Sequence, residues 1–394
     1  MKNKLFILGA SILQLPAIKA AKEMGLTVAV ADVNPKAVAI PYADVYYNVS
    51  TVDEKGIYEA AKDFGADGIL TVATDMPMRA IAYTCDRMGL CGIDYKTAVT
   101  ATDKGEMIQA FERAGLPIPR YALPKSLEDA VILAETLKYP LICKPTDNSG
   151  SRGVSLVSSP EELADAIEYG KENSPSGTVI LEEYLRGTEV SAEVVVWEGE
   201  ATVLAVTDKL TTGAPYFVEL GHSQPSSLSA ETLEKVEKLA KDAAKAVGIK
   251  IGTAHVEIMV TENGPYLIEL GARMGGDCIT THLVPLSTGV NMLKAAINIA
   301  MGNSPKLTNR QSKGAAIRYV LPPIGIIKSI SGVKEAECMD GVKLVEITKQ
   351  SGEQGETVKN SADRLGFVIT QAETAEQAIA VAEKAADIIK TETF

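Results

Sequence analysis

Two glutamates stand in a segment whose pattern predicts a β-hairpin. Glu257 and Glu269 each lie within a run of alternating apolar residues, and the turn sequence ENGP at 262–265 joins the two runs. Asn-Gly between such runs is typical of a tight hairpin turn, which would bring the two carboxylates together on one face. Two acids buried side by side need a neutralising cation, and carboxylate oxygens suit Mg²⁺. The pattern predicts a Mg²⁺ site, although an exposed hairpin with solvated acids fits it too.

A second pattern combines an apolar strand, a lysine and a loop rich in glycine and serine. Residues 140–157 read PLICKPTDNSGSRGVSLV, with Lys144 at the end of the strand. Such a loop exposes successive backbone N–H groups, and with a lysine beside it the natural ligand is a polyphosphate. It is not a Walker loop, because no G-x-x-x-x-G-K-[ST] occurs and a β-like run follows at Val154–Val157. Ordinary hairpin-turn chemistry is the alternative here.

A third pattern is a strand that ends in EEYL at 182–185, followed by a second strand that opens at Glu189. Upstream, Lys104 opens a helix predicted over 103–114, where Gly115 ends it. These features, the lysine loop and the hairpin acids follow one another in a specific order. That order resembles the ATP-grasp superfamily, and the resemblance runs through essentially the whole chain.

The resemblance implies that ATP lies between two lobes. Glu257 and Glu269 match the metal ligands for Mg²⁺, or Mn²⁺ in its place, and Glu189 matches the acid that binds the ribose hydroxyls. The remaining ATP-binding residues are Lys104 and Lys144 at the phosphates, Ser149, Gly150, Ser151 and Gly153 in the loop that closes over them, and Glu182, Glu183 and Leu185 at the hinge whose main chain meets the adenine.

The chain departs from the superfamily at one position of the last motif. In much of the superfamily this motif reads Glu-x-Asn-x-Arg, whereas here Gly271 stands between Glu269 and Arg273. A glycine cannot supply an amide oxygen to a metal. We therefore expect a second metal site to be incomplete or completed by water.

The departure also points to a branch of the superfamily. The sequence GARMGGD at 271–277, His255 before Glu257, the segment 218–229 and a C-terminal extension resemble the L-amino acid ligases. Those enzymes join two amino acids, or an amino acid and a related amine, with cleavage of ATP to ADP. The resemblance implies that Arg273 neutralises the acyl phosphate and the oxyanion.

It also places His255 beside the substrate, as a second catalytic residue. From the residue types alone, His255 could equally be a satisfied core histidine. Arg273 could pair with Asp277 four positions on. Lys209 could be a third phosphate contact or a solvated lysine at a strand end. The remaining candidate substrate or phosphate contacts are Gly275, Gly276 and His222, of which His222 could merely close a loop.

The chemistry that these residues imply is carboxylate activation. A carboxylate must first become an acyl phosphate, which an amine then attacks, and no covalent enzyme nucleophile is needed. The expected partners are ATP, an amino acid or other carboxylate, and an amine. Two alternatives remain: a purine-biosynthesis or carbamoyl-phosphate-synthetase-like ligase that uses a phosphoribosylamine or bicarbonate, and a non-catalytic ATP-binding regulator.

Composition narrows the setting. The chain has 394 residues, of which 46% are hydrophobic and 23% charged, and its net charge of −12 with no basic run argues against nucleic-acid binding. Five cysteines without a C-x-x-C pair favour free thiols in a reducing, cytoplasmic compartment and argue against structural zinc. No apolar run approaches the length of a membrane span, and the first residues read better as a strand, turn and helix than as a signal peptide. A homodimer is the default expectation.

The predicted fold class is mixed α/β and α+β. Residues 1–100 alternate strands and helices and are predicted to form a doubly wound parallel sheet. The small lobe of the ATP-grasp domain, with a linker helix, is expected at 101–180 and the large lobe at 181–312. A C-terminal α+β extension is expected at 313–394, and it would cover the cleft and help to choose the substrate.

Overall fold

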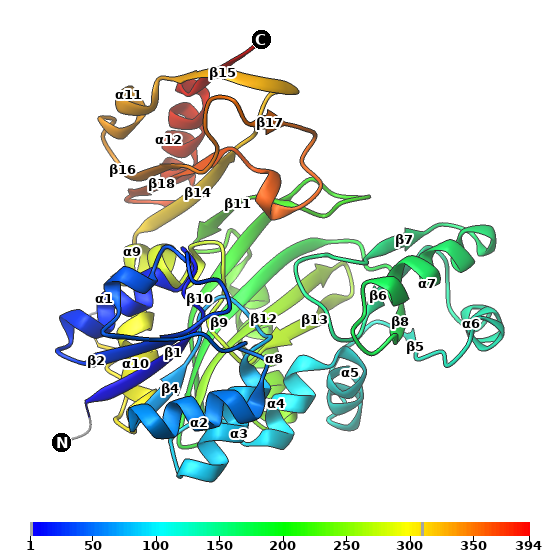
Figure 1. Cartoon of the computed structure of the whole chain (residues 1–394). Coiled ribbons are helices and arrows are strands. Elements are labelled where there is room, and N and C mark those ends of the chain that lie inside the picture. The colour runs from blue at the N-terminus through cyan, green and yellow to red at the C-terminus, as the bar shows by residue number, and fades with distance from the viewer. Residues whose placement is uncertain (1–2, 309–310) are drawn as a thin grey trace.

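The computed structural model describes residues 3–308 and 311–394. Its amino-terminal part is a parallel sheet of order β3-β2-β1-β4. Alternate residues of β1 face opposite layers: Leu5 and Ile7 pack against α1, while Phe6 and Leu8 pack against α2 and α3. The predicted doubly wound parallel sheet is confirmed (Figure 1). Its elements are β1 (Lys4–Leu8), α1 (Leu15–Glu23), β2 (Thr27–Ala31), η1 (Ile40–Tyr42), β3 (Val45–Tyr47), α2 (Glu54–Phe64), β4 (Gly68–Leu70) and α3 (Met78–Met88).

The small lobe is a four-stranded sheet of order β5-β8-β6-β7, with α6 and α7 packed against it. The linker helix α5 begins at Lys104, as predicted, because the side chain of Asp103 caps it by accepting a hydrogen bond from the amide of Glu106. The elements are α4 (Tyr95–Thr102), α5 (Lys104–Arg113), β5 (Tyr121–Ala122), α6 (Leu127–Ala134), β6 (Leu141–Pro145), β7 (Ser155–Val157), η2 (Pro160–Glu162), α7 (Leu163–Glu172) and β8 (Val179–Glu183).

The large lobe is built on an eight-stranded sheet of order β13-β12-β9-β10-β11-β14-β18-β16. Helix α8 covers one face, and it spans residues 230–247, where an amphipathic pattern predicts a helix. Ser229 caps its start, and Gly248 ends it in the left-handed conformation. The elements of this lobe are β9 (Thr188–Trp197), β10 (Glu200–Thr211), β11 (Glu219–Gln224), α8 (Ala230–Val247), β12 (Gly252–Thr261), β13 (Gly264–Gly271), η3 (Ile279–Leu283), α9 (Val284–Thr288) and α10 (Met292–Ala300).

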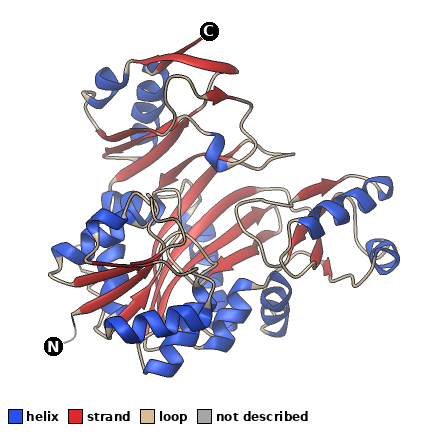
Figure 2. Ribbon diagram, viewed as in Figure 1, coloured by secondary structure: helices blue, strands red, loops and turns tan. Residues whose placement is uncertain are grey.

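The carboxyl-terminal part continues the same sheet. Strand β11 pairs with β14, so hydrogen bonds cross the boundary expected near residue 313, and the domain limits stay a prediction. A smaller sheet of order β17-β15-β19 lies beyond, in the part of Figure 2 nearest the carboxyl terminus. The elements are β14 (Gly314–Val320), β15 (Gly325–Ser331), α11 (Val333–Glu337), β16 (Val342–Ile347), β17 (Gln354–Gly355), η4 (Ser361–Asp363), β18 (Gly366–Ala372), α12 (Ala375–Ile388) and β19 (Lys390–Thr393).

The length and hydropathy of the helices decide whether any of them could span a membrane. Within residues 3–308 and 311–394, no single helix is long and apolar enough to cross a membrane. One pair of helical segments, Ile279–Thr288 and Met292–Ala300, meets the length and composition requirement together, and the pair is bent by 117°.

Candidate active site

The predicted hairpin is present, and it holds its two acids opposite one another. In the pairing of β12 with β13, Glu257 is the direct register partner of Glu269. Each carboxylate lies beside a lysine: Glu269 Oε1 is 3.1 Å from Lys104 Nζ, and Glu257 Oε2 is 3.4 Å from Lys209 Nζ. The alternative of two solvated acids is therefore wrong.

The hairpin acids do not form a complete metal cage. Among the residues that the structure describes, no group of three or more histidine, cysteine, aspartate or glutamate side chains is placed to hold a metal ion. Glu257 and Glu269 offer hard carboxylate oxygens, which fit Mg²⁺ when substrate phosphates complete its coordination.

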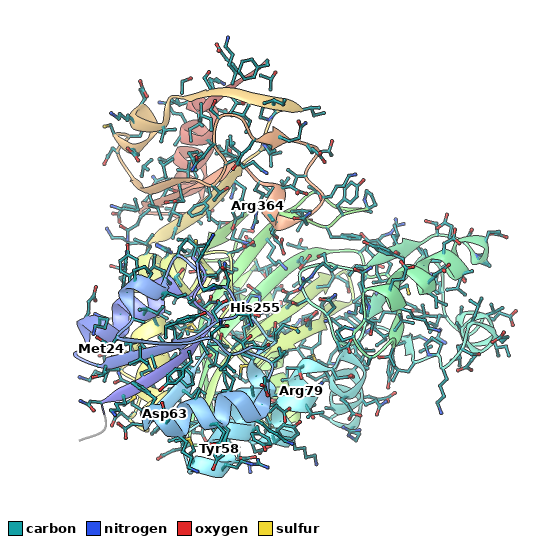
Figure 3. The ribbon with its side chains drawn as sticks, in the orientation of Figure 1. Met24, Tyr58, Asp63, Arg79, His255 and Arg364 are labelled. Atoms are coloured by element: carbon teal, nitrogen blue, oxygen red, sulfur yellow. The ribbon has the colours of Figure 1, made fainter. Side chains whose placement is uncertain are left out.

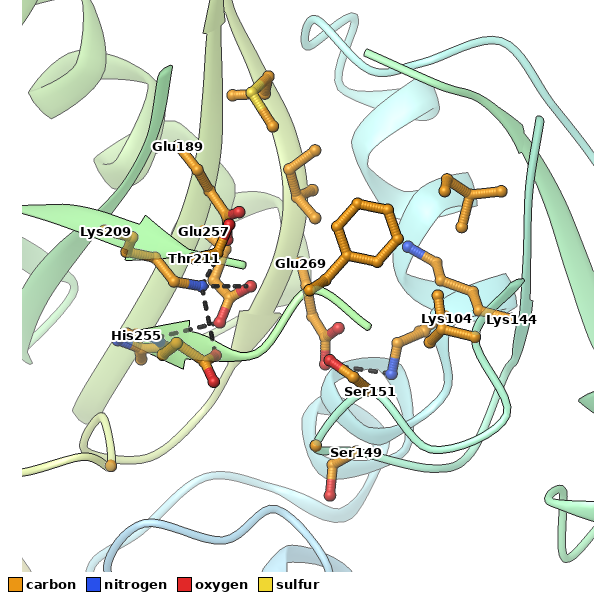
Figure 4. Close-up of a pocket in the computed structure, with 18 of the residues that line it drawn as sticks. Lys104, Lys144, Ser149, Ser151, Glu189, Lys209, Thr211, His255, Glu257 and Glu269 are labelled. Carbon is orange, nitrogen blue, oxygen red and sulfur yellow. Dashed lines mark hydrogen bonds and ion pairs between the residues drawn. The ribbon is translucent and has the colours of Figure 1, made fainter. Parts of the chain in front are cut away.

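The two predicted phosphate lysines lie on the small-lobe side of the site (Figure 4). Lys104, at the start of α5, donates from Nζ to the carbonyl oxygen of Asn148 at 2.7 Å. Lys144, on β6, lies 2.7 Å from Glu182 Oε2, and both side chains are buried. Burial by itself lowers the pKa of Lys104, but the charge and hydrogen bond of Glu269 outweigh it, so the pKa is raised. Both lysines line the cavity.

The loop between β6 and β7 has the predicted open geometry. Gly150 and Ser151 adopt positive φ angles of 67° and 57°, and both line the cavity together with Ser149. Gly153 is the exception, because it does not line the cavity. A Cβ on Gly153 would lie 2.7 Å from atoms of Asn173 and Pro145, so this glycine lets the base of the loop pack closely.

The hinge sequence EEYL at 182–185 begins with the last two residues of β8 and lines the cavity wall. Glu182, Glu183 and Leu185 all line the cavity. The carboxylate of Glu183 is already paired within the small lobe, because its Oε1 accepts hydrogen bonds from the backbone amide of Lys138 and from Arg120. Tyr184 and Phe217 lie with ring centroids 6.2 Å apart on the same wall, an aromatic pair that the sequence analysis missed.

Lys209 is not a solvated lysine at a strand end. Its side chain is buried, and Nζ contacts the carboxylates of Glu189 and Glu257, with Glu219 at 3.9 Å. Burial opposes the charged form, but the three carboxylates raise the pKa of Lys209 far above its ordinary value. The predicted ribose acid, Glu189, is therefore tied to the same cation as the metal-type acid Glu257.

His255 is not an ordinary core histidine, since carboxylates hold both ring nitrogens. Nδ1 lies 2.8 Å from Glu193 Oε1, and Nε2 lies 3.3 Å from Glu257 Oε1. Burial alone would lower the pKa of His255, but the charge and hydrogen bond of Glu193 and the bond to Glu257 raise it to about 9. His255 lies near the centre of the molecule in Figure 3. Glu193 was missed, and its signal was an acid in the apolar run VSAEVVVW.

Gly275 lies against the pair of His255 and Glu193 and does not line the cavity. A Cβ there would stand 2.6 Å from His255 Nδ1 and 2.9 Å from Glu193 Oε2. Gly276 does line the cavity. The predicted role of Gly275 as a direct substrate contact is therefore not favoured by its position, because it supports His255 from outside.

Arg273 does not pair with Asp277. Its NH2 group donates to Asp75 Oδ2 at 2.9 Å, and NH1 donates to the carbonyl oxygen of Met274 at 3.3 Å. Burial opposes the charge of Arg273, but Asp75 together with Glu257 and Glu269 raises its pKa. The arginine is thus a cation that contacts Asp75 and lies within the electrostatic influence of the two hairpin acids.

A polar cluster, made of Glu219, His222, Asp277, Tyr319 and Arg364, lies at the far end of the cavity. Asp277 pairs with Arg364, and His222 Nε2 is 3.5 Å from Asp277 Oδ2. The Arg364 guanidinium lies 3.6 Å from the centre of the Tyr319 ring. Because it faces Asp277 in this cluster, His222 does more than close a loop. Figure 3 places Arg364 where the C-terminal part meets the rest of the molecule.

One cavity of about 820 Å³ is lined by residues from each of these groups. Its wall includes every predicted site residue except Gly153 and Gly275. Lys104 and Lys144 lie on one side in Figure 4, with Glu189, Lys209, Glu257 and His255 on the other and Glu269 between them. The volume lies within the range of small-molecule sites.

Comparisons with known proteins agree with this architecture. Residues 137–281 match the family model for the ATP-grasp domain, and residues 318–393 match that for the L-amino acid ligase C-terminal domain 2. Alanine-anticapsin ligase of Bacillus subtilis strain 168 is 33% identical over 243 residues, which are 56% of this chain and 51% of the relative. The alignment thus spans about half the length of that curated relative.

Two solved structures share the fold over the whole chain. The L-amino acid ligase from Bacillus licheniformis superposes with a TM-score of 0.87 at 22% identity, covering 100% of this chain and 99% of that one. The phosphoribosylglycinamide synthetase from Anaerococcus prevotii gives a TM-score of 0.82 at 24% identity, with 100% of both chains covered. At these identities the likeness establishes the fold.

Residues 137–281 therefore form an ATP-grasp domain, as predicted, and the solved structures show the same fold over the whole chain. Within that superfamily, the chain carries an L-amino acid ligase C-terminal domain, which confirms the branch that the GARMGGD segment indicated.

Proposed function

We propose that this protein is an ATP-dependent carboxylate–amine ligase that forms an amide or peptide bond between amino acids and releases ADP and phosphate. The observation that carries the proposal is the single cavity. It places two lysines and a glycine-rich loop at one end, two facing carboxylates and Arg273 in the middle, and a second polar cluster at the other end. Such an arrangement holds a nucleotide and a second substrate in line.

ATP binds between the lobes in this proposal. Lys104 and Lys144 hold the phosphates, the loop with Ser149 and Ser151 closes over them, and the EEYL hinge meets the adenine. Lys144 is already held by Glu182, and Lys104 by Glu269, so neither lysine has to be ordered when the nucleotide arrives. Mg²⁺ held by Glu257 and Glu269, when bound, would neutralise phosphoryl charge and orient the γ-phosphoryl group.

The first step transfers that phosphoryl group. A carboxylate oxygen of the acyl donor attacks the γ-phosphorus, the bond to the bridging oxygen of ADP breaks, and an acyl phosphate forms. Lys209 contacts both Glu189 and Glu257, so its charge can help to neutralise a phosphoryl oxygen bound in the same cavity. Closure of the loop would keep water away from the acyl phosphate.

The second step joins the amine. Its nitrogen attacks the acyl carbon, inorganic phosphate leaves, and the nitrogen loses a proton to the phosphate or to solvent. Arg273 stabilises the oxyanion of the tetrahedral intermediate, a contribution of about 3 to 4 kcal/mol for a well-placed donor. Its raised pKa keeps the guanidinium charged throughout.

The polar cluster suits an amino acid as the acyl donor. Glu219 and Asp277 both line the cavity and can accept an ammonium group, while Arg364 and His222 fix Asp277 in place. Bicarbonate would have no ammonium group to place there. This observation favours the amino acid ligase over the carbamoyl-phosphate-like alternative.

The test measures Mg²⁺- and ATP-dependent phosphate release against a matrix of paired amino acids, with product masses determined. The proposal expects release that needs both an acyl donor and an amine. Release only with bicarbonate, or only when phosphoribosylamine is the amine, would assign the protein to the alternative ligase class. ATP binding without ADP formation in any mixture would favour a regulatory nucleotide binder.

A further inference from the structure

Asp75 belongs to the amino-terminal part of the chain, yet it contacts the predicted catalytic arginine. It follows β4, in the loop that leads to α3, and its Oδ2 accepts the 2.9 Å hydrogen bond from Arg273 NH2. Both side chains are 14% exposed, and both line the cavity. An element outside the two ATP-grasp lobes therefore forms the nearest wall to Arg273.

Gly271 makes room for this contact. A Cβ at position 271 would lie 2.5 Å from Asp75 Oδ1 and 3.1 Å from Arg273 Nε. Those distances are shorter than van der Waals contact, so any side chain at 271 would displace the carboxylate or the guanidinium. The glycine that removes an amide ligand from the motif is thus the feature that lets Asp75 approach.

The loop that carries Asp75 is fixed against the segment that carries Arg273. The amide of Ala73 donates to the carbonyl oxygen of Met274 at 3.3 Å, and Ala73 adopts a φ of 63°. A positive φ at a non-glycine residue costs on the order of 1 to 3 kcal/mol, and this conformation persists only where the surrounding structure holds it. The aspartate is therefore presented at a defined place and not on a free loop.

The contact has unused hydrogen-bonding capacity on both sides. Asp75 Oδ1 and Arg273 Nε are buried, and neither has a hydrogen-bond partner among the residues that the structure describes. A side-on pair, with Nε–H and NH2 donating to the two oxygens of one carboxylate, would satisfy both atoms together. A small rotation of Arg273 toward Asp75 completes that pair.

We propose that Asp75 is a positioning residue that fixes the guanidinium of Arg273 for oxyanion stabilisation, and that Gly271 is required to admit it. This inference rests on the ligase function proposed above. Asp75 acts on the arginine and not on a metal, because no third acidic, histidine or cysteine side chain in the described part of the chain joins the hairpin acids in a metal-binding group.

The first test is Asp75→Asn, which keeps the shape and removes the charge. We expect kcat for amide formation to fall about 10- to 100-fold, the scale of a misplaced catalytic group, while KM for ATP changes less than about threefold. Asp32→Asn is the matched control: Asp32 follows β2 of the same sheet and accepts two backbone hydrogen bonds at 2.8 Å, but it does not line the cavity. An unchanged kcat in Asp75→Asn would overturn the proposal.

The second test is a cycle with Gly271→Ala. In the native background this change should lower kcat as Asp75→Asn does, because the new Cβ meets Asp75 Oδ1. In an Asp75→Ala background the closest obstruction is absent and only the 3.1 Å contact with Arg273 remains, so Gly271→Ala should cause a smaller further loss than it does in the native background. Additive losses would show that Gly271 acts independently of Asp75 and would contradict the proposal.

A stability cycle separates this inference from the proposed function. Unfolding free energies of Asp75→Ala, Arg273→Ala and the double variant should be non-additive, because each single change leaves a buried charge without its partner. If no substrate pair turns over, the proposed function fails, while this cycle still decides whether Asp75 fixes Arg273. Additive free energies would overturn the inference whatever the activity.

Discussion

Asp277 and Arg364 form a two-pronged ion pair, with NH1 to Oδ2 and NH2 to Oδ1 both at 3.0 Å. Asp277 follows β13 in the large lobe, and Arg364 precedes β18 in the C-terminal part. Arg364 also donates to the carbonyl oxygen of Glu219 at 3.3 Å. The pair therefore links the substrate end of the cavity to the domain that is expected to cover it.

Removing the arginine should weaken both the fold and substrate binding. Arg364→Ala leaves Asp277 without its main cation, so we expect a loss of about 3 kcal/mol in the free energy of unfolding, the lower end for breaking a buried pair. KM for the amino acid should rise while KM for ATP stays within a factor of about two. Denaturant unfolding and initial rates measure both effects. Lys22→Ala, which breaks a surface pair with Asp44, is the control and should change neither.

The same pair predicts a specific dependence on pH. Burial opposes the charge of Asp277, but the nearby His222 and the two hydrogen bonds from Arg364 hold the pKa of its carboxyl well below the usual range. A lowered pKa stabilises the fold above the unfolded value of about 3.9, and that contribution is lost as the pH falls through the folded pKa. The stability difference between the native protein and Arg364→Ala should therefore narrow as the pH is lowered from about 5 to about 2. A constant difference would contradict the assignment.

The ion pair between Lys144 and Glu182 leads to a separate prediction about the protein without bound nucleotide. Both side chains are buried, and their charged atoms lie 2.7 Å apart. Lys144→Met leaves a buried carboxylate unpaired, which should cost about 3 to 5 kcal/mol in unfolding free energy and also weaken ATP binding. The double variant Lys144→Met/Glu182→Gln should recover much of the stability but not the ATP affinity. Calorimetry of unfolding and of ATP binding separates the two effects.

The hairpin acids should control the metal requirement. Glu269→Ala removes one of the two facing carboxylates, and we expect amine-dependent phosphate release to fall at least about 100-fold, since even outer-shell changes at metal sites cost 10- to 100-fold. Excess Mg²⁺ should not restore it. Full activity in this variant would remove Glu269 from the metal site. Chelation by EDTA should abolish release by the native protein, and added Mg²⁺ should restore it.

The position of Gly275 beside His255 and Glu193 predicts a steric effect when the glycine is replaced. Gly275→Ala places a Cβ 2.6 Å from His255 Nδ1, so either His255 or the backbone must shift, at a cost of about 1 to 3 kcal/mol. Gly276→Ala is the matched stability control, because its nearest contact, Ala73 Cβ, would lie at an ordinary 3.5 Å. Thermal unfolding of both variants tests the comparison. Equal stability of the two would show that the site tolerates movement of His255.

Local patterns were sufficient for the elements that carry most of the site. The Asn-Gly turn and alternating residues predicted the hairpin of Glu257 and Glu269, and an amphipathic pattern predicted α8. Element ends failed where a distant partner intervened. The sequence pattern predicts a last helix over 374–390, but α12 ends at Ile388, because residues 390–393 pair with β15 as β19. The pattern also predicts a first helix that begins at Ile12, but α1 begins at Leu15; here the reason is local, because residues 11–14 form a turn in which the amide of Gln14 donates to the carbonyl oxygen of Ser11.

The chain's motifs therefore predicted a class of chemistry: lysines for phosphates, paired acids for a metal and an arginine for an oxyanion. The partners of those residues were not readable in the same way. Arg273 meets Asp75 from the amino-terminal part, His255 meets Glu193 across the sheet, and Asp277 meets Arg364 from the C-terminal part. Spacing along a strand or helix fixes neighbours within a few residues, whereas contacts over longer separations depend on how whole layers pack, which no local period encodes.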